Sequence, residues 1–345
     1  MALPGRPRRL SRALGTHPLS LAAAVFAFGA ACAPGATSMG ALPAAIARII
    51  ERPFDSTATK AATSHVVIVS IDGLRPDAIG RFGATNLSRL AREGSHTFAA
   101  KTINPSKTLP SHTSMLTGEG PEEHGITWNS NQTHTHETLA VPTVFGVARK
   151  RGLHTAAFFS KGKFNHLEVP GSLDYSQAPN GDGRWTADRT LGDVVRYLGE
   201  HRPNLLFVHI GEPDKAGHLF GWMGRFYGRA VRKADAAVGQ LVTAADRAYG
   251  ANNYTLIITA DHGGHGRTHG TARAEDMTIP WIAWGKGVSA GTTITSAVRT
   301  MDTAGTALWL LGVNPPEGWA GTAVKSAFTA PAQAASDEAT HLATQ

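Results

Sequence analysis

Cysteine is almost absent from this 345-residue sequence, which contains only Cys32, so no disulfide within the chain supports its fold. Charged residues are also few, at 17% of the chain, while hydrophobic residues make up 42%. This balance excludes disorder over most of the length and predicts a large buried core. The sequence also lacks internal repeats and long low-complexity insertions, and its length fits one large domain or two small ones.

Acidic residues are outnumbered by basic ones, and the formal net charge at pH 7 is +7. Four of the positive charges belong to arginines close to the N-terminus: Arg6, Arg8, Arg9 and Arg12. Outside this group the excess of positive charge is small, and no basic patch demands a polyanionic partner. Nucleic-acid binding is therefore not implied by the charge.

The N-terminal arginines precede an apolar run, LSLAAAVFAFGAACA, which has the length of a signal sequence and is too short to span a membrane. We predict an export signal over residues 1–33, and hence a periplasmic, extracellular or membrane-anchored protein. Lipid attachment at Cys32 is one alternative for the single cysteine, and a removed or buried side chain without a role is the other. Residues 34–62 are predicted to be a linker, residues 63–330 the folded domain and residues 331–345 a C-terminal tail.

Five apolar runs have the character of strands buried on both faces, because they are continuous rather than alternating. They cover residues 65–72, 154–159, 204–210, 254–260 and 278–285. Helical patterns lie between them at 86–94, 143–152, 186–201 and 227–250, and a last one covers 301–312. Strands that alternate with helices predict an α/β sandwich with a largely parallel central sheet.

Three aspartates stand at or just beyond the ends of predicted strands, namely Asp72, Asp214 and Asp261. In open α/β sheets ligands bind beyond the carboxyl ends of the strands, so these carboxylates are expected at one edge. Each aspartate taken alone is also compatible with a helix cap or a turn.

Histidine accompanies two of these aspartates. Asp214 and His218 are four residues apart, a spacing that places both on one face of a helical turn. The segment TADHGGHGRTHG, residues 259–270, is either a solvated flexible loop or half of a metal site, since imidazole and carboxylate are common zinc ligands. It supplies Asp261, His262, His265 and His269.

Thr108 stands just before a short apolar helical stretch, where its hydroxyl is either an ordinary cap or a group close to helix amides that bind anions. A threonine hydroxyl is a poor nucleophile unless a base or a metal lowers its pKa. Its role in catalysis therefore depends on the metal site.

Together these motifs resemble the alkaline phosphatase superfamily and, within it, the type I phosphodiesterase/nucleotide pyrophosphatase family. The resemblance covers residues 65–325 and depends on the order of its motifs. These are VSIDGLRPD, NPSKTLPSHTSMLTG followed by HGITWN, GEPDKAGH, TADHGGHGRTHG, and DTAGTALWLLGVNPPEGWAG. It implies an alkaline-phosphatase-like three-layer sandwich in which residues 63–330 are a metal-dependent catalytic domain.

The resemblance also implies two divalent metal ions, with zinc as the expected identity, and a covalent phosphothreonine intermediate. Thr108 matches the nucleophile, and Asn129 matches the asparagine that binds a phosphoryl oxygen. The ligands of the metal that activates the nucleophile match Asp72, Thr108, Asp261 and His262. Those of the second metal match Asp214, His218 and His269, with His265 as a rival for His269. Four further histidines are expected to be supporting or surface groups: His112, His124, His134 and His136.

The substrate implied is a small phosphate ester or nucleotide, with phosphodiesters and pyrophosphates ahead of monoesters and phosphonates. Sulfatase chemistry is disfavoured, because threonine stands where those relatives use a modified cysteine or serine. Lys107, Lys161 and Lys163 are expected on the solvated surface, with phosphate binding as the alternative. Four aromatic residues are expected to pack in the core, with nucleobase stacking as the alternative: Trp128, Phe158, Phe159 and Phe164. A metal-stabilised binding protein without activity is the remaining hypothesis.

Overall fold

The computed structural model describes residues 61–131 and 139–329, all of which fall within one compact unit, Leu42–Gln345. The predicted export signal, nearly all of the linker, the C-terminal tail, His134 and His136 lie outside the described residues. The proposed division of the chain into these segments therefore stays a prediction. Within the described ranges, no helix combines the length and the apolar character needed to cross a membrane.

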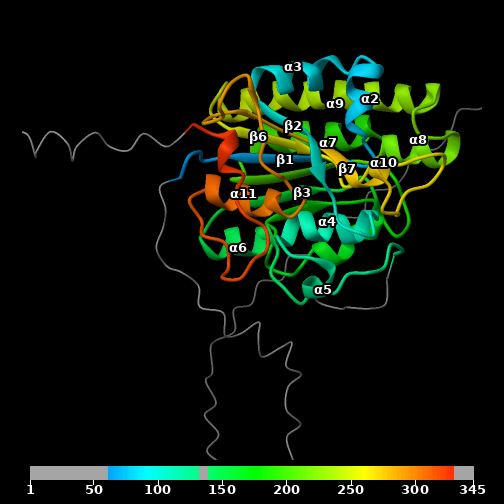
Figure 1. Cartoon of the computed structure of the whole chain (residues 1–345). Coiled ribbons are helices and arrows are strands. Elements are labelled where there is room, and N and C mark those ends of the chain that lie inside the picture. The colour runs from blue at the N-terminus through cyan, green and yellow to red at the C-terminus, as the bar shows by residue number, and fades with distance from the viewer. Residues whose placement is uncertain (1–60, 132–138, 330–345) are drawn as a thin grey trace, which may run out of the picture. The chain divides into compact units, whose positions relative to one another are not determined.

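An eight-stranded sheet forms the centre of this unit, in the order β4-β3-β5-β1-β6-β7-β2-β8 (Figure 1). Its inner strands pair in parallel, and β7 alone of the eight runs antiparallel to its neighbours, β6 and β2. The predicted largely parallel sheet is thus confirmed. The strands are β1 (Val66–Ile71), β2 (Ser95–Lys101), β3 (Thr155–Phe158), β4 (Tyr175–Gln177), β5 (Leu205–Ile210), β6 (Thr255–Thr259), β7 (Thr278–Gly285) and β8 (Thr292–Thr293).

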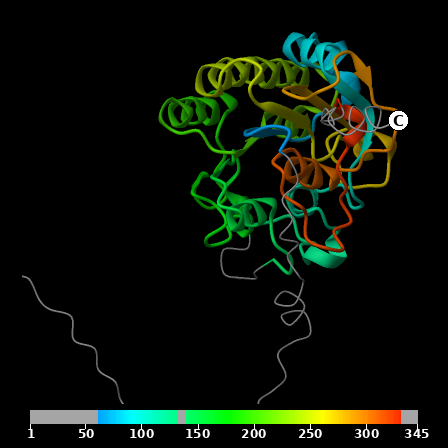
Figure 2. The same ribbon diagram turned by 90° about the vertical axis from the view of Figure 1, so that its left-hand side faces the viewer.

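Helices cover both faces of the sheet, which makes the predicted three layers (Figures 1 and 2). One layer holds α2 (Pro76–Arg81), α3 (Thr85–Glu93), α7 (Ala187–Glu200), α8 (Glu212–Phe220) and α9 (Arg225–Tyr249). The opposite layer holds α4 (Thr108–Thr117), α5 (Pro121–His124), α6 (Val144–Lys150) and α11 (Asp302–Leu310). Shorter pieces are η1 (Gly162–Leu167), α10 (Ala274–Met277) and η2 (Lys325–Ala327).

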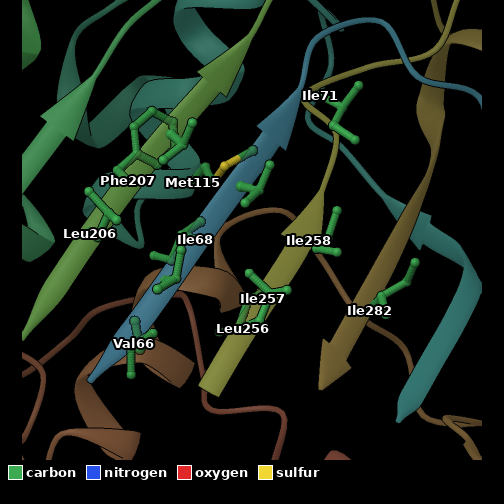
Figure 3. Close-up of a cluster of buried hydrophobic side chains, with 14 of the residues drawn as sticks. Val66, Ile68, Ile71, Met115, Leu206, Phe207, Leu256, Ile257, Ile258 and Ile282 are labelled. Carbon is green, nitrogen blue, oxygen red and sulfur yellow. The ribbon is translucent and has the colours of Figure 1, made fainter. Parts of the chain in front are cut away.

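The core lies between these layers and on both faces of the central strands (Figure 3). Every residue of β1, β5 and β6 is buried, as expected for parallel strands covered on both sides. Phe158, Phe159 and Phe164 are fully buried, and Trp128 packs against the same core while partly exposed. These four aromatic residues therefore serve the core, as predicted.

Candidate metal centre

Three adjacent strands, β5, β1 and β6, deliver the three predicted aspartates to one edge of the sheet. Asp72 directly follows β1, Asp261 follows β6, and Asp214 lies in the first turn of α8 after β5. The backbone ties them together, since Asp214 N–H donates to the Asp72 carbonyl over 2.9 Å. Gly73 N–H donates to Asp261 Oδ1 over 3.0 Å. All three carboxylates are at most 2% exposed.

Asp72, Asp261 and His262 form the first of two clusters suited to a metal ion, with all their ligand atoms within 4.8 Å of one another. His262 Nε2 lies 3.5 Å from Asp72 Oδ1 and 3.2 Å from Asp261 Oδ2. The hydroxyl of Thr108 lies beside this cluster, with Oγ1 3.3 Å from His262 Nε2. Thr108 is the first residue of α4 and is 1% exposed. The structure therefore brings a buried hydroxyl to the edge of a possible cation site.

Asp214, His262 and His269 form the second cluster, so His262 belongs to both. The rings of His262 and His269 stack with their centroids 3.6 Å apart. His218 joins from the outer side, with Nε2 3.2 Å from Asp214 Oδ1, and its side chain is 42% exposed. Two clusters that share a ring are necessarily close, and such proximity is what a two-metal phosphoryl-transfer site requires.

The imidazoles are held with one nitrogen turned toward the clusters. His262 Nδ1 faces the Gly263 carbonyl at 2.8 Å, and His269 Nδ1 faces the Ser106 carbonyl at 2.8 Å. A carbonyl only accepts, so each Nδ1 carries the hydrogen and each Nε2 keeps its lone pair for a metal. Burial and the neighbouring His262 lower the pKa of His269 to about 4, which favours this neutral form at pH 7.

His265, the rival candidate, lies elsewhere. Its Nδ1 contacts Asp276 Oδ1 at 2.7 Å, and Asp276 also accepts from Thr271. His265 therefore fixes the loop, and His269 rather than His265 joins His262 in the second cluster. Glycine is required just before His265, because a side chain at Gly263 would overlap the Glu275 carbonyl.

The site fits cations. Asp72 Oδ1, Asp214 Oδ1 and Asp261 Oδ2 are buried oxygens with no hydrogen-bond partner. Burying a carboxylate without a compensating positive charge costs free energy. The three aspartates carry three negative charges, and the one ammonium group close to them leaves two of these unbalanced. Oxygen and nitrogen donors of this kind suit divalent ions such as zinc. The described residues thus present two buried Asp/His clusters of the kind expected for a pair of metal ions.

Lys161 supplies that ammonium, and our expectation that it is a solvated surface residue is wrong. It is 2% exposed, and its Nζ lies 2.5 Å from Asp72 Oδ2 and 2.6 Å from Asp214 Oδ2. Burial alone would raise the pKa of both aspartates, and Asp72 would raise that of Asp214 further. The Lys161 charge and the neighbouring histidines together outweigh these effects, and both pKa values lie below their usual range.

Two more histidines support Asp72 and Asp261 from behind. His209, in β5, is fully buried and places Nε2 2.9 Å from Asp72 Oδ2, while Ser160 Oγ lies 2.8 Å from its Nδ1. His112, on α4, places Nδ1 3.3 Å from Asp261 Oδ2. The supporting role predicted for His112 is confirmed, whereas His209 was not anticipated. Its signal was a single polar residue inside an otherwise apolar strand.

Asn129 contacts the start of α4 at Leu109, the residue after Thr108, and has a defined orientation. Its Oδ1 accepts from Leu109 N–H at 3.0 Å and from Lys163 Nζ at 3.0 Å. Because both partners are donors, the oxygen end is fixed and the amide NH₂ is the end that can donate to a bound ligand. Lys163 therefore orients Asn129. Burial, followed by the Lys161 charge, lowers the pKa of Lys163 to about 8.

Comparison with known families gives one clear match. The family model described as type I phosphodiesterase / nucleotide pyrophosphatase matches residues 66–273, a range that contains every residue of both clusters.

Curated relatives of this chain include human ectonucleotide pyrophosphatase/phosphodiesterase family members 1 and 7 and venom phosphodiesterase 2 of Crotalus adamanteus. Each is 27% identical over 221 to 228 residues, which is 58–59% of this chain. The match spans 24% of member 1, 49% of member 7 and 27% of the venom protein. The chain thus spans at most about half the length of these relatives.

Solved structures share the fold. Murine ectonucleotide pyrophosphatase/phosphodiesterase 5, as an inactive variant in complex with AMP, superposes with a TM-score of 0.66 at 17% identity. The match covers 77% of this chain and 100% of that one. The human protein of the same name gives a TM-score of 0.66 at 15% identity, with the same coverage. These likenesses establish the alkaline-phosphatase-like architecture.

Proposed function

The chain belongs to the type I phosphodiesterase/nucleotide pyrophosphatase family, and on this premise we propose that it hydrolyses phosphate esters through a covalent intermediate on Thr108. The observation that carries the proposal is the 3.3 Å between the Thr108 hydroxyl and His262, the imidazole shared by the two clusters. Phosphodiester and pyrophosphate bonds are the substrates that the names of its relatives suggest. Phosphomonoesters are the second candidate, favoured by the buried Lys161.

Two metal ions would be held by the ligands expected from the sequence. One set is Asp72, Thr108, Asp261 and His262, and the other is Asp214, His218 and His269. When bound, two divalent ions, zinc being the proposed identity, supply the positive charge that lowers the pKa of the Thr108 hydroxyl and balances the phosphoryl oxygens.

Thr108 loses its hydroxyl proton as Oγ1 attacks phosphorus, and the new Oγ1–P bond replaces the bond to the leaving oxygen. The leaving group departs with that electron pair and takes up a proton. Water then attacks the same phosphorus, the Oγ1–P bond breaks, and the hydroxyl of Thr108 regains a proton. Asn129 contributes its NH₂ to a non-bridging oxygen in both steps. Burial of Thr108 limits the water that competes with the substrate.

Replacing the nucleophile tests this proposal. We expect Thr108→Ala to lose hydrolysis of both p-nitrophenyl phosphate and bis-p-nitrophenyl phosphate by at least about a thousandfold, because the hydroxyl that attacks phosphorus is removed. Thr108→Ser keeps the hydroxyl and should retain measurable turnover. Acid-quenched wild-type protein should carry phosphothreonine at residue 108, detected by mass spectrometry.

Chelation should abolish turnover, and zinc should restore it. Undiminished hydrolysis by Thr108→Ala would defeat the nucleophile assignment. A wild-type protein that binds zinc yet hydrolyses neither ester would favour the inactive binding protein instead.

A further inference from the structure

A cavity of about 260 Å³ opens beside the two clusters and carries an unusual density of positive charge. Lys161, Lys163 and Arg184 line it together with Asn129, and the one carboxylate on its wall, Asp182, is exposed. Lys161 links the cavity to the clusters through Asp72 and Asp214. Asn129 links it to Thr108 through the amide of Leu109. The cavity therefore adjoins the proposed nucleophile.

The spacing of the two lysines is fixed by the backbone. Gly162, between them, lies so close to the carbonyls of Pro179 and Gly181 that any Cβ would overlap both. Lys163 Nζ is held 3.0 Å from Asn129 Oδ1, and Lys161 is held by two buried carboxylates. These ammonium groups are thus preorganised, and a preorganised charge in a buried site acts strongly on a bound anion.

The charge of the cavity discriminates between phosphate esters. A phosphodiester carries one negative charge and a second organic group, whereas a terminal –PO₃²⁻ group carries two charges and needs no room for that group. Among the described residues, the cavity wall has no aromatic or aliphatic side chain that a second ester group would contact. Three cations on the wall of this cavity therefore favour the terminal group.

We propose that Lys161, Lys163 and Arg184 form a recognition site for a terminal –PO₃²⁻ group, so that phosphomonoesters are preferred over phosphodiesters. This inference rests on the proposed function and, within it, puts phosphomonoesters ahead of the phosphodiesters that the names of the relatives suggest. Lys163 also contributes to this recognition site indirectly, because it turns the NH₂ of Asn129 toward the terminal –PO₃²⁻ group. Arg184, whose guanidinium lies 4.0 Å from Asp214 Oδ2, closes the outer side.

Paired substrates test the proposal directly. We expect kcat/KM of the zinc-loaded wild type to be higher for p-nitrophenyl phosphate than for bis-p-nitrophenyl phosphate. Lys163→Ala and Arg184→Ala should each lower the monoester value about ten- to a hundredfold and the diester value less than about threefold. Lys150→Ala, an exposed lysine at the end of α6, is the matched control and should change neither value. A nucleoside diphosphate carries the same terminal –PO₃²⁻ group on an anhydride bond. Comparing its cleavage with that of p-nitrophenyl phosphate shows whether the site takes this group from an anhydride or from an ester.

Binding supplies a readout that does not depend on turnover. Titration calorimetry of zinc-loaded Thr108→Ala should show inorganic phosphate binding more tightly than dimethyl phosphate, and a further Lys163→Ala change should remove most of the difference. Lys161→Ala is measured in the same way once circular dichroism shows that it folds, and it should also weaken the binding of inorganic phosphate.

Two results would overturn the proposal: a diester preferred by the wild type, or lysine variants that weaken both substrates equally. Either result leaves the proposed function standing if Thr108→Ala is inactive. Activity that survives Thr108→Ala would instead defeat the proposed function.

Discussion

Gly73 links the segments that carry Asp72, Asp214 and Asp261 through its backbone. Its φ of +72° is a left-handed conformation, and its N–H donates to Asp261 Oδ1. Its carbonyl accepts from Trp222 Nε1 at 3.0 Å and from the Tyr227 hydroxyl at 2.9 Å. A Cβ at this position would lie 2.9 Å from the Asp214 Cα. At the scale of single residues, this glycine sets the separation of the carboxylates.

Gly73→Ala is therefore expected to damage stability and metal binding together. The left-handed backbone alone costs about 1–2 kcal/mol for alanine, and the contact with α8 adds to that cost. Urea unfolding should show the loss of stability, and zinc titration should show weaker binding. Gly80→Ala, with open space around the position, is the control. Unchanged zinc affinity in Gly73→Ala would contradict this role.

Asp214→Ala should remove one metal ion and leave the other. Asp214 belongs to the second cluster only, so the first cluster keeps Asp72, Asp261 and His262. We expect zinc content to fall from two to about one per chain and turnover to fall by several orders of magnitude, with unchanged circular dichroism. His218→Ala should act in the same direction. Asp188→Ala, exposed on α7, should keep both ions, and two full equivalents in Asp214→Ala would refute the ligand assignment.

The three site aspartates were predictable from sequence because each follows a run of residues that forms a buried parallel strand. The distance between Asp72 and Asp261 along the chain mattered little, since the carboxyl ends of β1 and β6 are neighbours. Lys161 was not predictable in this way. It stands between a strand and a short turn, where no periodic pattern indicates which side chains the tertiary structure buries.

At the scale of elements, the turn between α8 and α9 is built around the ring of Trp222. Gly217 and Gly264 lie flat against this ring, and a Cβ at Gly217 would come within 2.5 Å of it. The ring centroid is 5.2 Å from that of His218 and 5.9 Å from that of His269. Trp222 is 7% exposed, so it supports the second cluster from the inside.

Trp222→Ala is expected to lower the free energy of unfolding by about 3–5 kcal/mol, the usual cost of a large cavity. Zinc binding at the second cluster should weaken more than at the first, because His218 and His269 lose the surface they rest on. A zinc titration that resolves two binding steps measures the affinity of each cluster separately. Trp309→Ala, on α11 in the opposite layer, should destabilise the fold without this selectivity. Equal weakening of both sites would count against the assignment.

Sequence patterns were most informative for the inner strands and least for the sheet edge. The run at 278–285 indicated a buried strand but not that β7 runs antiparallel. The sequence did not predict β2, because its buried and exposed residues are mixed and form no continuous apolar run. It did not predict β4 or β8, because strands of two or three residues are too short to show a hydrophobic periodicity. These edge elements take their conformation from pairing with strands distant in the sequence.

At the scale of the whole molecule, buried neutral histidines make stability depend on pH. His124 is 1% exposed, accepts from Ile126 N–H through Nδ1 at 3.0 Å and faces Ser114 Oγ through Nε2 at 3.0 Å. Protonation of Nδ1 would break the first of these bonds. Burial accordingly lowers the pKa of His124 from 6.5 to about 4.

Between pH 6.5 and 4 the unfolded chain therefore binds a proton at this position that the folded chain does not. Stability is present above this window and is lost as pH falls through it, by up to about 1.4 kcal/mol per pH unit for this histidine. His124→Gln should show a smaller difference in unfolding free energy between pH 7 and pH 5, measured by urea titration with chelator present. Equal differences in the variant and the wild type would contradict this account.

The order of strands in the sheet has a consequence for synthesis of the protein. Neighbouring strands β5, β1 and β6 lie far apart along the chain, and His269 comes later than all three. A nascent chain therefore exposes Asp72 long before Asp261 and His269 have been translated. A growing chain that ends before residue 269 lacks a member of the second cluster, so it cannot complete both clusters. Binding of both ions would therefore require that these distant parts of the polypeptide have come together.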